Sequence, residues 1–236
     1  MKKITLFLLS VIALASCTAS QQMGATDSHA YVNGDPPITE SLFSDKNATI
    51  SEENIQKILN GSYSLPNSLR VAFVKLESAQ NRNRYYWSDE QYLKSQQQYL
   101  DLFSQDFKNS PRVKSISTIP DILVSKNPTF TSIREAAVRT QSDIVVVYTI
   151  NSDIYSQYKL FSKKNIKAFA TVQLIVLDVR TGLIPFTTIV TKDFQDKKND
   201  KDLSESEAAN RIKNEAVLQT IGEVGKQVTT FLERGK

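Results

Sequence analysis

Asp178 and Arg180 are the two residues whose types and spacing most directly raise the question of chemistry. They stand two positions apart in LIVLDVRTGLIPFTTIV, residues 174–190, close to Gly182. A carboxylate and a guanidinium held on a tight loop could form a catalytic pair, because a positioned carboxylate can exchange a proton with a substrate. The same letters also fit the charged corner of a β-hairpin, in which glycine supplies a positive φ. The choice between these interpretations decides whether an enzyme is expected.

The rest of the sequence offers few other groups for catalysis. The single histidine, His29, lies in a polar segment where nothing would hold its ring, and seven glycines leave few places for a phosphate-binding loop. Paired carboxylates stay candidates in principle, namely Asp121, Asp143, Asp153 and Asp178. Two of them flank predicted strands, however, where Asp commonly bonds the local backbone. We therefore predict no catalytic residue, no metal and no cofactor.

The N-terminus indicates export and lipidation. Lys2 and Lys3 precede an apolar run at 4–15, which is too short to span a bilayer and is typical of a secretory signal. Leu14-Ala15-Ser16-Cys17 resembles the bacterial lipobox, whose cysteine is acylated and becomes the mature N-terminus. Cys17 is also the only cysteine, so none would remain for a disulfide or a zinc site. An ordinary signal peptide with an incidental cysteine is the alternative.

Lipidation at Cys17 would anchor the protein to a membrane, since each buried methylene contributes about 0.8 kcal/mol. In lipoproteins of diderm bacteria an Asp after the cysteine is associated with the inner membrane; Thr18 stands there and favours the outer membrane, with the protein facing the periplasm. Removing the signal lowers the net charge from +4 to +2, with 27 Lys and Arg against 25 Asp and Glu. Without a basic block, nucleic-acid binding has little support.

Three segments follow from composition and periodicity: a signal peptide at 1–17, a flexible polar tether at 18–47, and a single α/β domain at 48–236. At flexible-coil scaling the tether reaches about 30 Å. The patterns predict a short helix ending near 60, a strand at 69–76, a helix from about 88 to 108, a strand at 112–119, a helix at 132–140, strands at 144–150, 166–176 and 183–194, a polar loop at 193–202, and a long final helix capped by Ser204 and Glu207.

The strongest strand signals lie in the second half of the chain. Residues 144–150, IVVVYTI, are a β-branched run typical of an interior strand covered on both faces. Residues 166–176 have apolar side chains at even positions, and the odd positions include Lys167, Thr171 and Gln173, which is a period of two. A hairpin to the next strand is predicted, and its corner favours the structural interpretation of Asp178.

The most distinctive candidate contact site is aromatic and basic. It comprises Arg82, Arg84, Tyr85, Tyr86 and Trp87. Exposed residues of these types often carry interface energy, about 2 kcal/mol or more each when a partner buries them. The alternative is that the cluster packs at the start of the following helix.

Three stretches carry a resemblance to a known family: LRVAFVKLE at 69–77, REAAVRTQSDIVVVYTI at 134–150 and ATVQLIVLDVRTGLIPFTTIV at 170–190. Together they resemble the family that contains the TolB N-terminal domain, the curli-secretion lipoprotein CsgG and the penicillin-binding-protein activator LpoB. In that family the late strand ends in Asp-x-x-Thr-Gly, which Asp178, Thr181 and Gly182 match. Residues 141–143 depart from the family's small-residue turn. The resemblance implies a mixed β-sheet sandwiched by helices, and periplasmic binding or assembly rather than catalysis.

We therefore expect a non-enzymatic, lipid-anchored envelope protein that binds another envelope protein or helps to assemble a complex. Two alternatives stay open: an envelope hydrolase acting on carbohydrate or peptidoglycan, and a self-associating homo-oligomeric component. A concave cluster of carboxylates with raised pKa values would favour the enzyme. An exposed apolar or aromatic patch would favour the binding protein.

Overall fold

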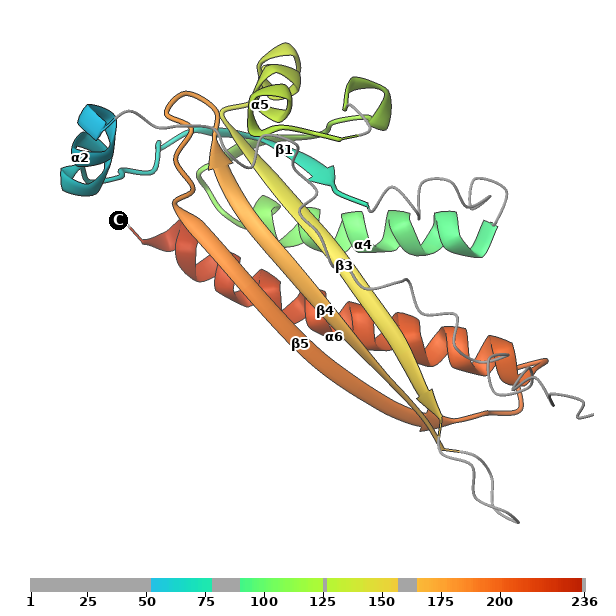
Figure 1. Cartoon of the computed structure of the whole chain (residues 1–236). Coiled ribbons are helices and arrows are strands. Elements are labelled where there is room, and N and C mark those ends of the chain that lie inside the picture. The colour runs from blue at the N-terminus through green and yellow to red at the C-terminus, as the bar shows by residue number, and fades with distance from the viewer. Residues whose placement is uncertain (1–51, 78–89, 125–126, 157–164, 235–236) are drawn as a thin grey trace, which may run out of the picture.

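The computed structural model describes residues 52–77, 90–124, 127–156 and 165–234. Its elements, in chain order, are α2 (Glu52–Asn60), β1 (Leu69–Lys75), α4 (Glu90–Lys108), β2 (Val113–Thr118), the 3-10 turn η2 (Asp121–Leu123), α5 (Phe130–Arg139), β3 (Ile144–Ser156), β4 (Asn165–Asp178), β5 (Phe186–Lys197) and α6 (Glu205–Glu233) (Figure 1). This arrangement confirms the predicted α/β class with a long C-terminal helix.

Five strands form one mixed sheet in the order β2-β1-β3-β4-β5. β1 runs parallel to both of its neighbours, whereas β3 to β4 and β4 to β5 are antiparallel hairpin pairs. β3 and β4 pair from Ile144 opposite Asp178 to Ser156 opposite Ile166. The three later strands are therefore long, and they extend well beyond β1 and β2 (Figure 1).

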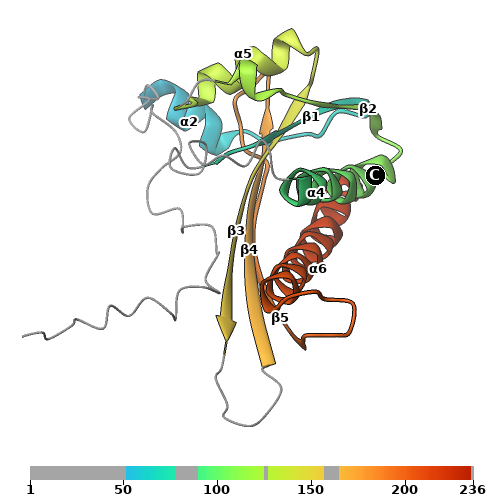
Figure 2. The ribbon, with the colours of Figure 1, turned by 90° about the vertical axis from the view of Figure 1, so that its right-hand side faces the viewer.

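The helices cover the two faces of the sheet unequally. α4 and α6 lie along one face, and α5 lies on the other face at one end only (Figure 2). Burial along β3 follows this arrangement: every residue from Ile144 to Tyr148 is buried, and from Thr149 to Tyr155 burial alternates. The near half of β3 is thus covered on both faces, as its β-branched run predicted, and the far half packs on one face.

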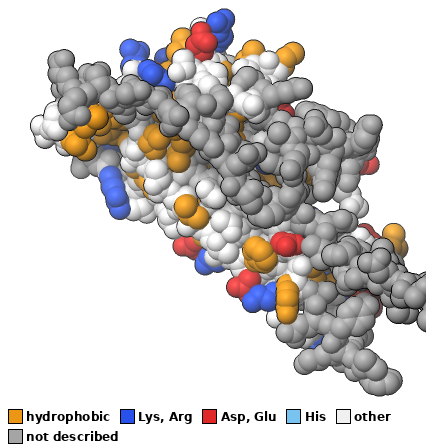
Figure 3. All heavy atoms as spheres, in the orientation of Figure 1, with side chains coloured by type: hydrophobic (Ala, Val, Ile, Leu, Met, Phe, Trp, Pro, Cys, Tyr) orange, Lys and Arg blue, Asp and Glu red, His pale blue; other side chains and the backbone are white. Residues whose placement is uncertain are grey.

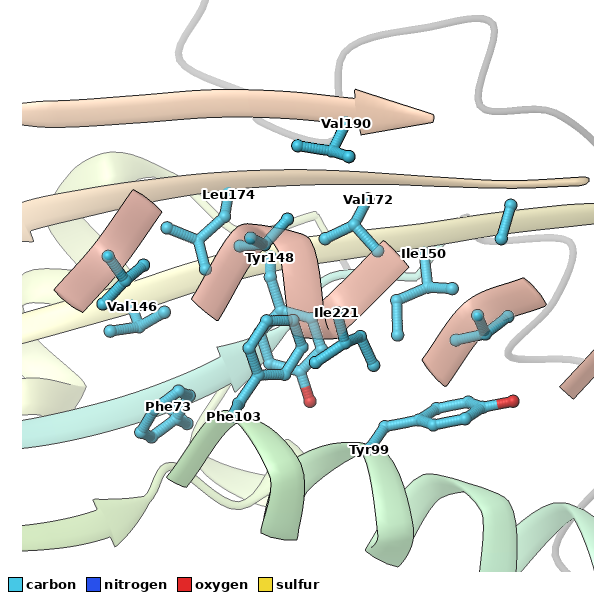
Figure 4. Packing of buried hydrophobic residues seen from close by; sticks show 14 of the residues in the cluster. Phe73, Tyr99, Phe103, Val146, Tyr148, Ile150, Val172, Leu174, Val190 and Ile221 are labelled. Carbon is cyan, nitrogen blue, oxygen red and sulfur yellow. The ribbon is translucent and has the colours of Figure 1, made fainter. Parts of the chain in front are cut away.

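Aromatic side chains of α4, β1 and β3 fill the centre of the larger hydrophobic cluster (Figure 4). The Phe103 ring centroid lies 4.8 Å from that of Tyr148 and 6.4 Å from that of Phe73. Phe73 also meets Phe107 edge-on at 5.1 Å. Each such side chain contributes roughly 1.5–3 kcal/mol through burial, and together they join α4 to the sheet.

α4 and α6 come into close contact where Asp106 faces Gly225. A Cβ atom at position 225 would lie 1.8 Å from Asp106 Oδ2 and 2.3 Å from its Cγ. The same Oδ2 is buried without a hydrogen-bond partner in the described part of the chain, and burial raises the pKa of this carboxyl group. Glycine is required at 225 because the carboxyl group occupies the space of a side chain.

Gly225→Ala is expected to lower the free energy of unfolding by about 1–2 kcal/mol, because Asp106 must move away. Asp106→Ala should restore most of this loss in the double variant, since it removes both the steric conflict and a buried oxygen that lacks a partner. Urea denaturation of both single variants and the double variant measures the coupling. Strictly additive effects would contradict the contact.

β3 and β5 continue further than their sequence patterns predicted. β3 extends from the apolar run 144–150 to Ser156 because β4 pairs with every added residue. β5 reaches Lys197 and takes up part of the predicted loop at 193–202, where Asp193 forms an ion pair to β4 at 2.9 Å. Pairing with the adjacent strand of each hairpin outweighs the polar composition of these ends.

Two helix starts show how local hydrogen bonds set a boundary. α5 begins two residues before the predicted Ser132, because Thr129 is the N-cap: its side chain accepts from Ser132 N at 2.9 Å, and Thr129 N donates to Ser132 Oγ at 2.8 Å. α6 begins after Ser204, whose hydroxyl accepts from Glu207 N at 3.0 Å. The Glu207 carboxylate accepts from Leu203 N rather than from Ser204 N, so the reciprocal bond lies one residue earlier than in a capping box.

Candidate functional site

Asp178 lies buried at the corner that joins β4 to β5. Its Oδ1 accepts hydrogen bonds from Thr181 N at 2.7 Å and from Thr181 Oγ1 at 2.8 Å. Gly182 N donates to the Asp178 carbonyl oxygen at 2.9 Å, and Gly182 adopts a φ of 74°, which favours glycine. β5 begins at Phe186, three residues later than predicted, after Pro185, which has no N–H for the ladder. Asp178 therefore closes a turn.

The same corner is tied to two other parts of the fold. Tyr63 OH donates to Asp178 Oδ2 at 3.0 Å, and burial, followed by the negative charge of Asp178, raises the pKa of this phenol. Arg134 of α5 donates from Nε to the Val179 carbonyl at 3.0 Å and from Nη2 to the Arg180 carbonyl at 3.2 Å. Asp178 and its neighbours thus hold three segments together, which is a structural role.

Asp143 is engaged by an arginine from the neighbouring strand. Arg70 donates from Nε to Asp143 Oδ2 at 3.0 Å, from Nη2 to Oδ1 at 2.8 Å, and from its backbone N to Oδ2 at 2.9 Å. The side-chain hydrogen bonds from Arg70 hold the pKa of Asp143 below its ordinary value, against the smaller opposing effect of burial. This bidentate pair joins β1 to the start of β3.

The stability that Asp143 provides is expected to be lost only in strong acid. Because its pKa is lower in the folded chain than the unfolded value of about 3.9, its contribution is complete above that value and declines as the pH falls through the folded pKa. Asp143→Asn should lower the free energy of unfolding by up to about 1 kcal/mol at neutral pH. Urea denaturation at several pH values should show the two proteins converging in acid; a constant difference would contradict this origin.

The four candidate carboxylates do not form an acid–base pair. Asp143 and Asp178 lie at the same end of the sheet, since Ile144 stands opposite Asp178. Each carboxylate already accepts hydrogen bonds within the protein, Asp143 from Arg70 and Asp178 from Thr181 and Tyr63. Asp121 is exposed in η2, and Asp153 lies far along β3 opposite Phe169. At this end of the sheet the structure therefore brings together carboxylates whose hydrogen bonds join segments of the fold.

A different surface is left open on the far halves of the long strands. Within the described ranges, no helix packs on this side of β3, β4 and β5 beyond α5 (Figure 2). The outward side chains, here called the open face, are Asn151, Asp153, Tyr155, Lys167, Phe169, Thr171, Gln173, Ile189, Thr191 and Asp193. Tyr155, Phe169 and Ile189 are 60%, 41% and 70% exposed. Figure 3, seen from this side, shows hydrophobic side chains standing between charged and other polar ones.

Polar side chains of the open face contact one another across β4 and β5. Lys167 Nζ lies 2.9 Å from Asp193 Oδ2, and the hydroxyls of Thr171 and Thr191 lie 2.8 Å apart across β4 and β5. Phe169 stands between these pairs, as an aromatic side chain at a position where the strand pattern predicts polar ones. An aromatic residue at a position that the period-two pattern assigns to a polar one is the feature of the sequence that indicates this surface. Aromatic side chains among polar neighbours are enriched where proteins meet.

The other predicted site residues lie outside the described ranges. These are Cys17 and the aromatic-basic cluster of Arg82, Arg84, Tyr85, Tyr86 and Trp87. Among the described residues, no helix is long and apolar enough to cross a membrane. The same residues contain no group of three or more His, Cys, Asp or Glu side chains placed to hold a metal ion.

Comparison with known proteins gives similarity in structure alone. No protein-family model and no curated protein matches the chain. A hypothetical protein from Chlamydia trachomatis is 14% identical, with a TM-score of 0.41, over 70% of this chain and 98% of that one. A candidate lipoprotein from Caulobacter crescentus is 8% identical, with a TM-score of 0.41, over 70% and 92%. A minor lipoprotein from Acinetobacter baumannii is 7% identical, with a TM-score of 0.36, over 68% and 92%. At these values no role transfers to this chain.

Proposed function

We propose that this protein is a non-enzymatic lipoprotein, anchored to the outer membrane through Cys17, which binds another envelope protein on the periplasmic side. The observation that carries the binding role is the open face. The far halves of β3, β4 and β5 are packed by α6 on one side, and they expose Tyr155, Phe169 and Ile189 on the other. The resemblance of Asp178, Thr181 and Gly182 to the TolB, CsgG and LpoB family supports periplasmic binding or assembly as the class of activity.

The open face fits this role better than the β5 edge of the sheet. β5 is an edge strand, and its second half carries Lys192, Asp193, Asp196 and Lys197. Charged side chains on an edge strand oppose the addition of further strands. The open face has aromatic and aliphatic side chains that a partner can bury, and the Lys167–Asp193 ion pair beside them can set its orientation.

Site-directed photo-cross-linking in living cells tests the surface. A cross-linking residue at position 169 or 189 is expected to give one discrete adduct with an envelope protein. The matched control is position 226, where Lys226 is exposed on α6 behind the sheet. Equal adducts at all three positions would overturn the assignment. An adduct of twice the protein's own mass would instead support self-association.

The anchor has a separate test. Cys17→Ala is expected to abolish acyl labelling and to move the protein out of the membrane fraction. Cys17→Ser provides a second variant with the same loss of sulfur and almost the same volume. If either variant stays in the membrane fraction with unchanged labelling, the lipidation proposal is wrong.

A further inference from the structure

β3 is paired on both sides over its first part only. β1 pairs with it as far as Lys75 opposite Tyr148, where Leu76 N donates to the Tyr148 carbonyl oxygen at 2.9 Å. β4 pairs with it on the other side as far as Ser156. Within the described ranges, no strand pairs with β3 on the β1 side beyond Tyr148 (Figure 1). β3 therefore has a strand edge inside the sheet.

The backbone groups on this edge follow from the paired part of β3. Successive residues of a strand direct their N–H and C=O groups to alternate sides. Because the Tyr148 carbonyl faces β1, the backbone groups of Ile150, Ser152 and Ile154 face the same side. The Ile154 N–H donates to the neighbouring Asp153 Oδ1 at 2.7 Å, a local bond that satisfies an edge group without a strand. Ile150 and Ser152 direct two N–H and two C=O groups to this side, here called the inner edge.

A space next to the inner edge lies between α4 and α6. It has a volume of about 570 Å³ and adjoins the N-terminal halves of both helices. Ile150 and Ser152 line it from the sheet, and Tyr99 and Val217 line it from the helices. Figure 4 shows the Tyr99 ring and the Ile150 side chain on the same side of β3. A strand added at the inner edge would direct every second side chain into this partly apolar space.

Several polar side chains that line this space already have partners in the protein. Lys75 Nζ lies 2.6 Å from Glu77 Oε1 and 5.7 Å from the centre of the Tyr92 ring. The lining also includes Glu207 and Lys213, which carry opposite charges. These side chains favour neither an anion nor a cation as a ligand, so the backbone groups of the inner edge are the distinctive feature of this surface.

We propose that the inner edge binds an extended segment of another polypeptide as an added strand, which continues the line of β1. Main-chain hydrogen bonds to Ile150 and Ser152 provide the affinity, and alternate side chains of the segment provide the specificity. Apolar side chains of the segment contact Tyr99, Ile150 and Val217 on the helical side. Its other side chains are polar, because they lie beside the outward Asn151.

The charges of β5 disfavour a second copy of this chain as the added strand. β5 is the outermost strand on its side, and the lysines and aspartates of its second half oppose pairing with a further strand. Binding at the inner edge does not require a partner on the open face, because the backbone groups of β3 make it. The two surfaces can therefore be tested separately.

A titration with a designed peptide tests the inner edge. The probe is a capped nonapeptide of alternating valine and threonine with a lysine at each end, and NMR titration of the full chain in detergent gives the dissociation constant. Ser152→Pro is expected to weaken binding at least tenfold, because proline removes an N–H from the inner edge and leaves the bonds to β4 in place. Ser152→Ala keeps this N–H and is the matched control, which should bind as the wild-type protein does.

Two further peptides extend the test to the ligand, and they carry it alone if thermal melting shows that Ser152→Pro is unfolded. One is methylated on the backbone nitrogens of its valines, and the other on those of its threonines. Only one edge of an added strand faces β3, so one methylated peptide should bind at least tenfold more weakly and the other should bind like the parent.

Binding of the parent peptide with this difference between the methylated peptides, and loss in Ser152→Pro where that variant folds, supports the proposal. Four results overturn it. They are no binding at millimolar concentration, equal binding of the two methylated peptides, unchanged binding by folded Ser152→Pro, and slow hydrogen exchange of the Ser152 amide before any peptide is added. The last result would mean that this chain, or a second copy of it, already covers the inner edge.

Discussion

Phe103→Ala is expected to lower the free energy of unfolding by about 3–5 kcal/mol, the range found for large aromatic truncations in a core. Phe103 is 1% exposed and packs against both Phe73 and Tyr148, so its removal leaves a cavity between α4 and the sheet. The neighbouring rings cannot collapse into that space without losing their own contacts. Urea denaturation measures the change, and a reduced melting temperature should accompany it.

Leu93→Ala is the matched control for this prediction. Leu93 lies on the same helix and is 43% exposed. Its replacement should change the free energy of unfolding by no more than about 0.5 kcal/mol, as is usual for surface positions. If the two variants lost equal stability, α4 would not be joined to the sheet through its aromatic face.

Asp178→Ala is expected to cost about 2–3 kcal/mol, because several hydrogen bonds to one buried carboxyl group are lost together. Its partners come from two places: Thr181 in the turn and Tyr63, which is 115 positions away. The variant therefore loosens both the hairpin corner and the segment before β1. Denaturation gives the total loss, and amide hydrogen exchange at residues 181 and 182 reports the corner itself.

Thr181→Ser is the control for the corner, because serine keeps both donors to Asp178 and removes one methyl group. It should stay within about 0.5 kcal/mol of the wild-type protein. Tyr63→Phe isolates the distant contact and should cost about 1 kcal/mol. An Asp178→Ala loss no larger than that of Thr181→Ser would contradict the anchoring role.

The contacts at the β4–β5 corner explain why Asp178 and Arg180 look like a catalytic pair in the sequence but have structural roles in the fold. The Asp178 side chain points into the corner and binds Thr181 and Tyr63, whereas the Arg180 side chain is exposed and its carbonyl binds α5. A catalytic pair requires two groups that face a common space. Here the two side chains face different surroundings.

The amino-acid sequence alone determined the class of the fold, the long C-terminal helix and the interior position of β3. These features depend on hydrophobic periodicity and on local turn and cap residues, which neighbouring positions specify. Each of these patterns can be recognised from a few neighbouring residues: the buried run at 144–150, the period of two at 166–176 and the glycine at 182.

Only the tertiary structure decided which distant residues meet. Tyr63 with Asp178, Arg70 with Asp143 and Asp106 with Gly225 become neighbours through packing, and no local pattern encodes these pairs. The open face arises in the same way. Its existence depends on where the helices lie and end, because a surface is left open only when no other element packs against it.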